Sequence, residues 1–268
     1  MTASSSSSPS PSPSSGKKVL RKAANKPKSA TGAKSAGAKT KVAIPASSAS
    51  AKNPVAPLPE RIPALVELLK KTYPDAHCEL VHSNPLELLI ATMLSAQCTD
   101  VQVNIVTKDL FKKYKTPSDY VNVGIEELME DVKRIGLYRN KAKNIQTCCK
   151  LLLDKHNGKV PNTMDDLIEL AGVGRKTANV VLGNAFGINV GVVVDTHVAR
   201  LSQRLGLTTL IDPVKIEQVL MKLFPRHDWT MLSHWLIFHG RRRCKAQRPD
   251  CPGCELKAVC PSYPITKF

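Results

Sequence analysis

A short turn with two glycines, Gly172-Val173-Gly174, constrains the fold of this chain more than any other feature. Thr163 is placed to cap a short helix over 164–170, and helix-forming residues run from Arg175 to Phe186. Glycine lets a backbone turn through positive φ and come close to another molecule. The sequence therefore predicts a helix, a tight hairpin and a second helix, with backbone amides aimed at an anion such as a phosphate.

Lys176 stands in the first turn of the second helix, where the positive end of the helix dipole disfavours a cation. Partial burial and the helix N-terminus would both favour the free amine, which covalent catalysis through a Schiff base requires. Contact with phosphate is the simpler interpretation of a Gly-x-Gly-x-Lys run. Both interpretations of Lys176 stay open at this point.

An aspartate follows the second helix across an apolar return. Gly187 ends the helix, and the return over 187–194 can span about 26 Å, which exceeds the helix length of about 18 Å. The chain can therefore bring Asp195 back level with Lys176. Asp195 is equally well placed to cap the next helix, and a cap at the mouth of a cleft can also be a catalytic carboxylate.

Four cysteines lie close together near the C-terminus, at Cys244, Cys251, Cys254 and Cys260. Disulfides are not expected, because the sequence has no secretory signal. Zinc and a [4Fe–4S] cluster both suit four thiolates, and the spacing alone does not separate them. The cations Arg241, Arg242, Arg243, Lys245 and Arg248 crowd this region, either to face phosphate or to offset thiolate charge.

The positive charge is concentrated at the N-terminus. Residues 1–59 hold ten of the net seventeen positive charges and no acid. Their Ser, Pro, Ala and Lys composition predicts a disordered basic arm, which either attracts nucleic-acid phosphates or keeps the protein soluble. The arm shares its Ser-rich, acid-free character with organelle transit peptides but has almost no arginine. No run of about 20 apolar residues predicts a membrane span.

The rest of the chain is patterned as helices, so the expected fold class is all-α. Asn84 and Pro85 start a buried helix that ends at Leu94, and Thr99 or Asp100 caps the next one. Helical patterns are expected over 60–73, 86–94, 101–114, 125–134, 143–156, 213–224 and 229–240.

Three of these motifs together resemble the endonuclease III family of iron–sulfur DNA glycosylases. They are the hairpin over 170–181, the run Val194-Asp195-Thr196-His197 and the four cysteines, and the similarity covers about residues 60–262. One departure is visible, because Ala171 stands where the family usually has a proline that would stiffen the turn.

The resemblance implies catalysis by Lys176 and Asp195 and a [4Fe–4S] cluster on Cys244, Cys251, Cys254 and Cys260. It also implies a helix-hairpin-helix glycosylase fold with a six-helix domain over 78–188. Residues 60–77 and 189–268 would form a discontinuous cluster domain, and the active site would be the cleft between the two domains.

The expected partner is double-stranded DNA with a damaged base or an abasic site. In the family, the positions of Gln97 and Leu137 enter the base stack, and apolar wedges are a known device for unstacking bases. The residues expected to contact DNA are Gly172, Val173, Gly174, Arg175, Gln97, Asp100, Leu137, Arg139, Lys141, His197, Lys245 and Arg248.

The function implied is that of a bifunctional DNA glycosylase/AP lyase in base excision repair, acting on oxidised pyrimidines. An adenine-excising glycosylase without lyase activity is one alternative, and a non-catalytic helix-hairpin-helix DNA-binding protein is another. The presence of Lys176 opposite Asp195 speaks against both. A monomer with no membrane association is expected, in the bacterial cytoplasm at the nucleoid or, in a eukaryote, in an organelle or the nucleus.

Overall fold

The computed structural model of the chain describes residues 55–265. Within that range the chain forms eleven α-helices and two 3₁₀ turns, and it contains no strand there. The all-α prediction is therefore confirmed. None of the helices in this range is long and apolar enough to cross a membrane. The basic arm predicted over 1–59 falls almost wholly outside the described residues.

One hydrophobic core draws its buried residues from Leu80 to Leu182, with partly buried residues as far as Val190 packed against it. Seven helices surround this core: α2 (Pro85–Leu94), α3 (Asp100–Lys113), α4 (Pro117–Asn122), α5 (Ile125–Asp131), α6 (Tyr138–His156), α7 (Met164–Ile168) and α8 (Arg175–Ala185). The helix α2 is its centre, since every residue from Leu88 to Leu94 is buried.

A second core joins the first described helix to the C-terminal part of the chain. Its buried residues lie in two stretches, from Ile62 to Ala76 and from Val192 to Leu256. The helices around it are α1 (Leu58–Thr72), α9 (Thr196–Arg204), α10 (Pro213–Leu223) and α11 (Trp229–Arg242), with the 3₁₀ turns η1 (Arg226–Asp228) and η2 (Lys257–Val259). Two distant segments of the chain therefore share one core.

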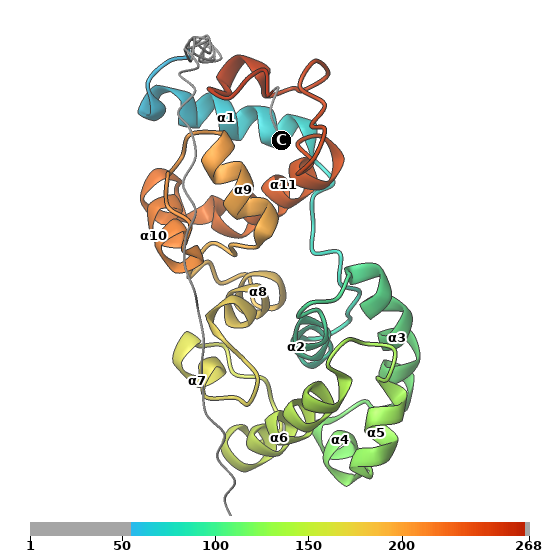
Figure 1. The fold of residues 1–268 in the computed structure, drawn as a ribbon. Coiled ribbons are helices and arrows are strands. Elements are labelled where there is room, and N and C mark those ends of the chain that lie inside the picture. Colours follow the sequence, from blue (N-terminus) through green and yellow to red (C-terminus); the bar gives the residue numbers. More distant parts are fainter. Residues whose placement is uncertain (1–54, 266–268) are drawn as a thin grey trace, which may run out of the picture. The chain divides into compact units, whose positions relative to one another are not determined.

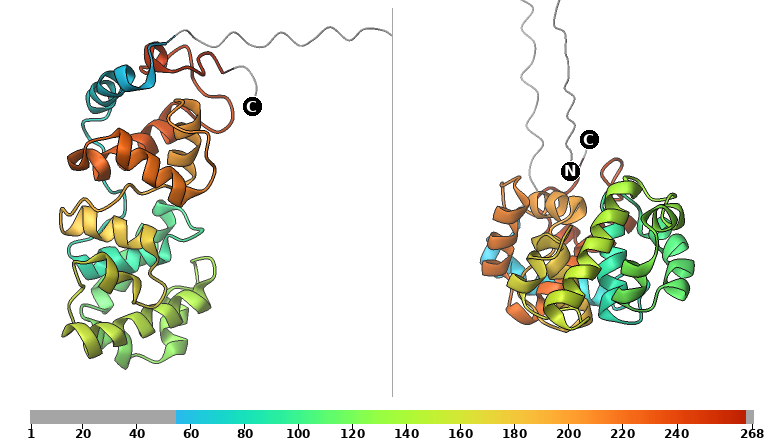
Figure 2. Two further views of the ribbon diagram at one scale, coloured as in Figure 1. Left: turned by 90° about the vertical axis from the view of Figure 1, so that its left-hand side faces the viewer. Right: turned by 90° about the horizontal axis from the view of Figure 1, so that it is seen from below.

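The helix α8 lies between the helices of the two cores. It packs against α2 and α7 on one side and against α11 on the other. Figures 1 and 2 show α1, α9, α10 and α11 gathered at one end and α3 to α6 at the other. The hairpin at the start of α8 is therefore placed where residues from both cores can meet.

Local capping places most helix starts where the sequence predicts them. The side chains of Asn84, Thr163 and Asp195 accept hydrogen bonds from Glu87 N, Asp166 N and Val198 N at 3.0, 3.2 and 2.8 Å. Of the two candidate caps before α3, Thr99 is the one used. Each cap satisfies an amide that has no acceptor inside its own helix.

The sequence patterns missed the short helix α4. Thr116 and Asp119 form a capping box at its start, with the Asp119 carboxylate accepting from Thr116 N at 2.8 Å. A Thr-Pro-x-Asp run is a recognisable start signal, so this helix could have been found. The helix α5 also ends at Asp131, earlier than the expected Arg134, because the chain tightens into a turn in which Ile135 N bonds Val132 O at 2.9 Å.

Candidate active site

Lys176 and Asp195 line the same pocket, as do Asp100 and Arg241. Both cores contribute walls to this pocket: Thr92 comes from α2 and Phe238 from α11. The remaining lining residues are His77, Cys78, Glu79, Leu80, Ser95, Val180, Asn184, Val193, Thr230, Ser233, His234 and Ile237. Lys176 and three carboxyl groups, those of Glu79, Asp100 and Asp195, therefore line one recess.

The start of α8 carries Lys176 into the pocket as the second residue of the helix. Lys176 is exposed to solvent, so the prediction that it is partly buried is wrong. Gly174, Arg175 and Lys176 are all exposed at the start of α8, and the buried positions of this helix begin at Ala178. Lys176 is therefore open to solvent and still lines the pocket.

The two glycines of the hairpin have different roles. Gly172 has φ +75°, and a Cβ there would lie 3.0 Å from Asn144 and 3.1 Å from Met93 Cε. Gly174 has an extended φ of −101° and nothing within 4 Å of its Cβ position. The first glycine is therefore required by the fold, whereas the second keeps open space in front of the first-turn amides of α8.

Arg175 reaches back into the protein. Its Nε and Nη2 atoms donate to the two carboxylate oxygens of Glu217 on α10 at 2.9 and 3.1 Å. Asn179 Nδ2 donates to the same carboxylate at 2.8 Å. This geometry favours a structural role for Arg175 over the predicted contact with DNA, because two of its donors are already engaged beside Lys176.

Asp195 has the double role that its position permits. Its side chain caps α9 through Val198 N, and it also lines the pocket. Asp100 lies close by at the start of α3. Burial raises the pKa of the Asp100 carboxyl, the Asp195 carboxylate adds to this, and Lys176 and His197 oppose it. The effects of Asp195, Lys176 and His197 on Asp100 show that these four groups share one electrostatic neighbourhood.

Arg241 bridges the pocket from α11. Its guanidinium pairs with Asp100 at 2.7 Å and also with Glu79. Burial lowers the pKa of Arg241, although its guanidinium stays charged. The pair with Arg241 favours the ionised form of Asp100, against the effect of burial.

The neighbouring arginines are also paired with acids. Arg242 lies 3.3 Å from Asp75, and Arg243 lies 2.7 Å from Asp250 and 2.9 Å from Glu255. From the sequence alone, every cation around the cysteines is a candidate to face phosphate. The structure instead uses Arg241, Arg242 and Arg243 in ion pairs within the protein.

The two turns expected to enter DNA lie next to each other. Gln97 and Leu137 are both exposed and both left-handed, with φ of +54° and +59°. A Cβ on Gly136 would lie 3.7 Å from Gln97 O, so the turns touch. Leu137 is 58% exposed, so its side chain is open to solvent at this turn.

The prediction that Lys141 contacts the DNA backbone is wrong. The residue is only 6% exposed, and its Nζ donates to Leu94 O at 2.9 Å and to Ala96 O at 2.5 Å. Residues at the start of α6 alternate between the surface and the turn after α2, and Lys141 falls on the inner side. Its ammonium cannot face a phosphate in this arrangement.

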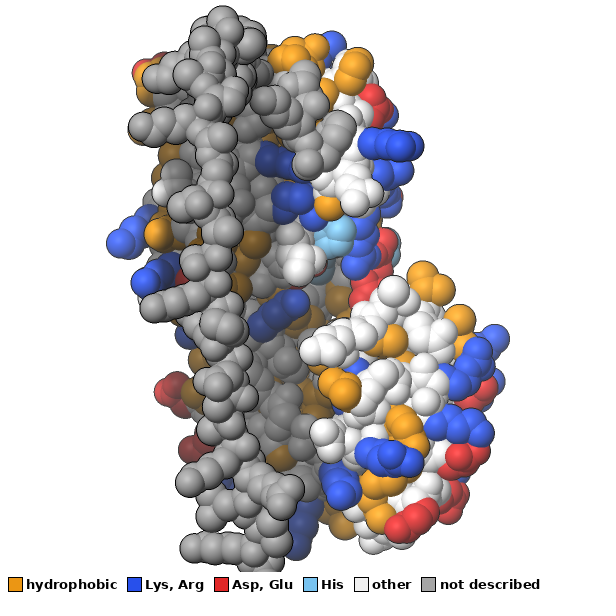
Figure 3. All heavy atoms as spheres, in the orientation of Figure 1, with side chains coloured by type: hydrophobic (Ala, Val, Ile, Leu, Met, Phe, Trp, Pro, Cys, Tyr) orange, Lys and Arg blue, Asp and Glu red, His pale blue; other side chains and the backbone are white. Residues whose placement is uncertain are grey.

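The remaining expected DNA contacts lie nearer the surface. Arg139, Lys245 and Arg248 are exposed, and the Arg139 guanidinium lies 5.2 Å from the Tyr138 ring centroid. His197 is half-buried, with its Nδ1 atom 3.2 Å from Arg200 Nη2. On the face drawn in Figure 3, Lys and Arg side chains lie on both sides of the recess between the two groups of helices.

The four C-terminal cysteines line one small cavity. In a tetrahedral zinc site the sulfurs would lie about 3.8 Å apart, given a Zn–S distance of about 2.3 Å. Among residues 55–265, the ligand atoms that gather within 4.8 Å of one another belong to His239, Cys254 and Glu255, which includes one cysteine only. Within these residues no three of the four sulfurs lie within 4.8 Å of one another, so they are not gathered as closely as a single zinc ion needs.

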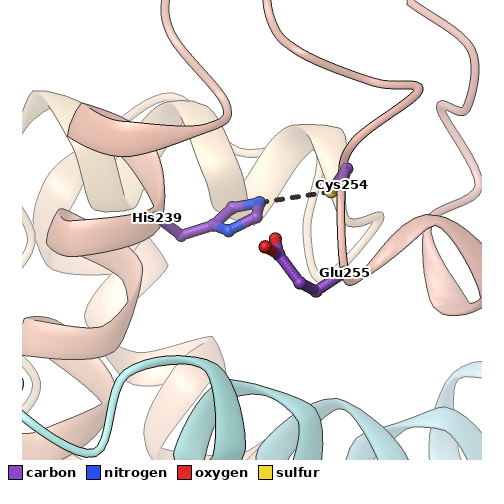
Figure 4. Close-up of side chains that lie close together, drawn as sticks. All are labelled: His239, Cys254 and Glu255. Atoms are coloured by element: carbon purple, nitrogen blue, oxygen red, sulfur yellow. Dashed lines mark hydrogen bonds between the residues drawn. The ribbon is translucent and has the colours of Figure 1, made fainter.

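Donors surround these sulfurs. Arg204 Nη1 lies 3.3 Å from Cys244 Sγ, and Ile265 N donates to Cys251 Sγ at 3.4 Å. His239 Nε2 lies 3.6 Å from Cys254 Sγ, as Figure 4 shows. Donors aimed at sulfur stabilise thiolates and the metal clusters that they bind.

Several residues of the site were not predicted from the sequence. Arg241 and Glu79 frame Asp100, Glu217 holds Arg175, and His234 lies in the pocket with Nε2 at 2.7 Å from Asn184 Oδ1. Burial lowers the pKa of His234 to about 4. The sequence did contain one signal for the role of Glu217. This glutamate falls within the apolar pattern of 213–223, and a buried carboxylate needs a cationic partner.

Comparisons with known proteins agree with this geometry. Residues 90–226 match the HhH-GPD superfamily of base excision DNA repair proteins. Endonuclease III of Bacillus subtilis is 55% identical over 189 residues, which cover 70% of this chain and 86% of that protein. Endonuclease III of Synechocystis sp. is 50% identical over 203 residues, covering 76% and 93%.

Solved structures of the same kind share the fold. A non-covalent endonuclease III–DNA complex is 54% identical with a TM-score of 0.72, covering 75% of this chain and 94% of that one. A trapped covalent endonuclease III–DNA intermediate has the same identity and TM-score and covers 75% and 95%. With its hairpin, its lysine and aspartate in one pocket and its four cysteines in one cavity, this chain belongs to the endonuclease III family within the HhH-GPD superfamily.

Proposed function

We propose that this chain is a bifunctional DNA glycosylase and AP lyase of base excision repair, in which Lys176 is the nucleophile and Asp195 its acidic partner. The observation that carries the proposal is that both residues line one pocket, although they come from different helices. The solved relative in which endonuclease III is covalently trapped on DNA supports a covalent mechanism.

The reaction begins once the damaged nucleotide is out of the base stack, because its sugar cannot be reached inside the duplex. The free amine of Lys176 attacks C1′ of the deoxyribose, the N–C1′ bond to the base breaks, and the base leaves with its bonding electrons. Loss of a proton from the amine and ring opening give a Schiff base. A proton then leaves C2′ and the C3′–O bond breaks, so the strand is cut by β-elimination.

Asp195 supports these steps by its charge. A carboxylate beside the sugar stabilises the positive charge that develops at C1′, or takes and returns a proton. Asp100 lies in the same recess, but its pair with Arg241 at 2.7 Å makes it less available for proton transfer. We therefore assign the proton and charge work to Asp195 and a shaping role to Asp100.

The DNA contacts follow from the exposed surfaces. The first-turn amides of α8 and the open space at Gly174 suit a phosphate oxygen. Gln97 and Leu137 project from adjacent turns towards a base stack, and Arg139, Lys245 and Arg248 supply positive charge for the backbone. Oxidised pyrimidines are the lesion class that the family resemblance suggests for this pocket.

We further propose that Cys244, Cys251, Cys254 and Cys260 hold a [4Fe–4S] cluster. The four cysteines line one cavity, and among residues 55–265 no three of their sulfurs lie within 4.8 Å of one another, which supports such a group over zinc, as do the donors from Arg204 and His239. When bound, the cluster would tie together four points of the short segment from Cys244 to Cys260. The loop that carries Lys245 and Arg248 lies between two of its ligands, so the cluster would fix this loop.

The two hydrophobic cores suggest two domains with boundaries close to 78–188 for the first, and to 60–77 with 189–268 for the second. The pocket that holds Lys176 and Asp195 has walls from both cores, as expected for a catalytic cleft between domains. We propose that the protein acts as a monomer, because each residue assigned to the reaction comes from one chain.

Borohydride trapping tests the function directly. The wild-type protein should form a covalent complex with a duplex that contains one abasic site, and Lys176→Ala should abolish the complex while duplex binding is retained. The matched control is Lys143→Ala, an exposed lysine on α6 that lies away from the pocket lining. Absence of a wild-type complex would leave a DNA-binding protein without lyase chemistry.

A further inference from the structure

The buried lysine at the start of α6 has no role in the reaction proposed above, and its surroundings are unusual. Lys141 is 6% exposed, and among residues 55–265 its ammonium makes no ion pair with a carboxylate. Burying a cation without an acid is costly in free energy, so other contacts of the ammonium must offset this cost. Within the same described range, the hydrogen-bond acceptors of its ammonium are the carbonyl oxygens of Leu94 and Ala96.

These carbonyls belong to the C-terminal end of α2 and the turn that follows. A helix leaves its last carbonyls without intrahelical donors, and its negative end attracts a cation. Lys141 therefore caps α2 from another helix, across 47 residues of sequence to Leu94. The residue directly after the capped turn is Gln97, which is held in a left-handed conformation that an L residue rarely adopts.

The same lysine is tied to the second projecting turn through its own helix. Leu137 is the N-cap of α6, with a left-handed φ of +59°, and Lys141 N donates to Leu137 O at 3.1 Å. The backbone of Lys141 thus holds the Leu137 turn and its side chain holds the Gln97 turn. One residue sets the position of both projecting side chains relative to each other.

The face of α6 that carries Lys141 also touches the hairpin. Asn144 lies one helical turn further on, and it is among the atoms closest to the Cβ position of Gly172, at 3.0 Å. Met93, on α2 beside the capped carbonyls, approaches the same position at 3.1 Å. The Gln97 turn, the Leu137 turn and the hairpin at Gly172 are the three loops that the proposed function brings to DNA. All three therefore contact residues in the first two turns of α6.

We infer that Lys141 is a positioning residue for DNA opening, and that it acts by clamping the Gln97 and Leu137 turns into one rigid wedge. This inference rests on the proposed function only in that the two turns enter the base stack. Lys141 touches neither the sugar nor the base. Its effect is expected in the step that opens the stack and not in the attack by Lys176.

The test compares Lys141→Met with Lys143→Met. Methionine keeps the unbranched apolar stem of lysine but ends one atom earlier and has no donor, so Leu94 O and Ala96 O lose their partner. Lys143 lies on the same helix, is exposed, and is not among the residues that line the pocket. The first readout is the fluorescence of 2-aminopurine placed opposite the lesion, which rises when the stack opens. We expect this rise with wild type and Lys143→Met and its loss with Lys141→Met.

The second readout is the single-turnover rate of borohydride trapping on two substrates. On a fully paired duplex with one abasic site, Lys141→Met should be slower by about 10- to 100-fold, as for a misplacement of about 1 Å. On a duplex whose abasic site lies in an unpaired bubble, the stack is already open, and the rate should stay within about two-fold of wild type. The bubble rate and the absorbance of the cluster also report that the variant is folded.

Further outcomes keep the inference refutable. Equal losses on the paired and bubble substrates, or fluorescence like that of Lys143→Met, would overturn the wedge role of Lys141. If Lys141→Met is not recovered folded, Lys141→Gln retains one donor amide and should give an intermediate loss confined to the paired duplex. If wild type forms no covalent complex on either substrate, the proposed lyase fails, while the fluorescence still decides on Lys141.

Discussion

The ion pair between Arg175 and Glu217 gives the sharpest test of how the hairpin is held. Arg175 precedes Lys176 directly, and Glu217 comes from a helix of the other core. The perturbations are Glu217→Gln, which keeps the shape and removes the charge, and Arg175→Met, which keeps the stem and removes the donors. The double variant completes a thermodynamic cycle.

The magnitudes follow from burial. The Glu217 side chain is 6% exposed and the Arg175 side chain 45%, so solvent screens the pair in part. The bond from Asn179 to a buried carboxylate contributes about 1.5 kcal/mol, and the half-exposed pair adds about 1 kcal/mol. Arg175→Met removes the pair and leaves the buried Glu217 carboxylate with Asn179 as its donor, so it should lower the free energy of unfolding by about 1 to 3 kcal/mol. Glu217→Gln keeps an acceptor for Asn179 but removes the charge, so it should lower this free energy by about 1 to 2 kcal/mol. The double variant should cost less than the sum by about 1 kcal/mol, because the two changes remove the same contact.

Two assays separate the structural role from DNA contact. Urea unfolding measures the three free energies, and the salt dependence of duplex affinity counts phosphate contacts. Each phosphate contact that is lost lowers the slope of log affinity against log salt by about 0.9. If Arg175 serves the hairpin, the slope for Arg175→Met equals that of wild type, although the trapping rate falls as Lys176 is displaced.

A structural role for Arg175 is refuted if Arg175→Met lowers the salt slope by one contact while Glu217→Gln leaves both stability and slope unchanged. That pattern would mean that the guanidinium turns outward to a phosphate when DNA binds. A cycle without coupling energy would also refute it. A side chain at Gly191 would collide with the Glu217 carboxylate, so Gly191→Ala offers an independent route to the same weakened hairpin.

Three further predictions concern other parts of the site. Replacing the exposed Lys245 and Arg248 by serine should weaken duplex binding and reduce the salt slope by about 0.9 for each phosphate contact, and an unchanged slope would remove this loop from the interface. The pKa of His234 falls from 6.5 to about 4 in the folded protein, so the unfolded state binds more protons between these pH values. Stability from this residue is complete above pH 6.5 and is lost as the pH falls towards 4, by about 3 kcal/mol, and urea midpoints of His234→Gln should be flatter over that range. Finally, His239→Phe removes the donor beside Cys254 and should lower the reduction potential of a bound cluster, which electrochemistry measures, whereas an equal potential would rule out that hydrogen bond.

Sequence patterns predicted those features of the site that depend on neighbours in the chain. The caps at Thr163 and Asp195 connect residues three apart, and the left-handed turn at Gly172 depends on one missing side chain. Such features repeat wherever the same few residues occur, because they are set by backbone sterics and local hydrogen bonds.

Contacts between distant residues were not predictable in the same way. Arg241 and Asp100 are separated by 141 residues, and Lys141 and Leu94 by 47. The predictions from sequence therefore assigned Lys141 to DNA contact. They also grouped the arginines before Cys244 as one set of cations. The residue type does not reveal whether a charged side chain faces water, an acid or a carbonyl. Only its surroundings in the folded protein decide its role.

By itself, the sequence determined an all-helical chain, the hairpin before Lys176, the cap at Asp195 and the set of four cysteines. Tertiary structure alone decided that Lys176 is exposed at a pocket rim, that Arg175 is held by Glu217, and that Lys141 is buried against α2. The physical reason is that local propensity acts over a few residues, whereas burial and ion pairing depend on how separate helices pack.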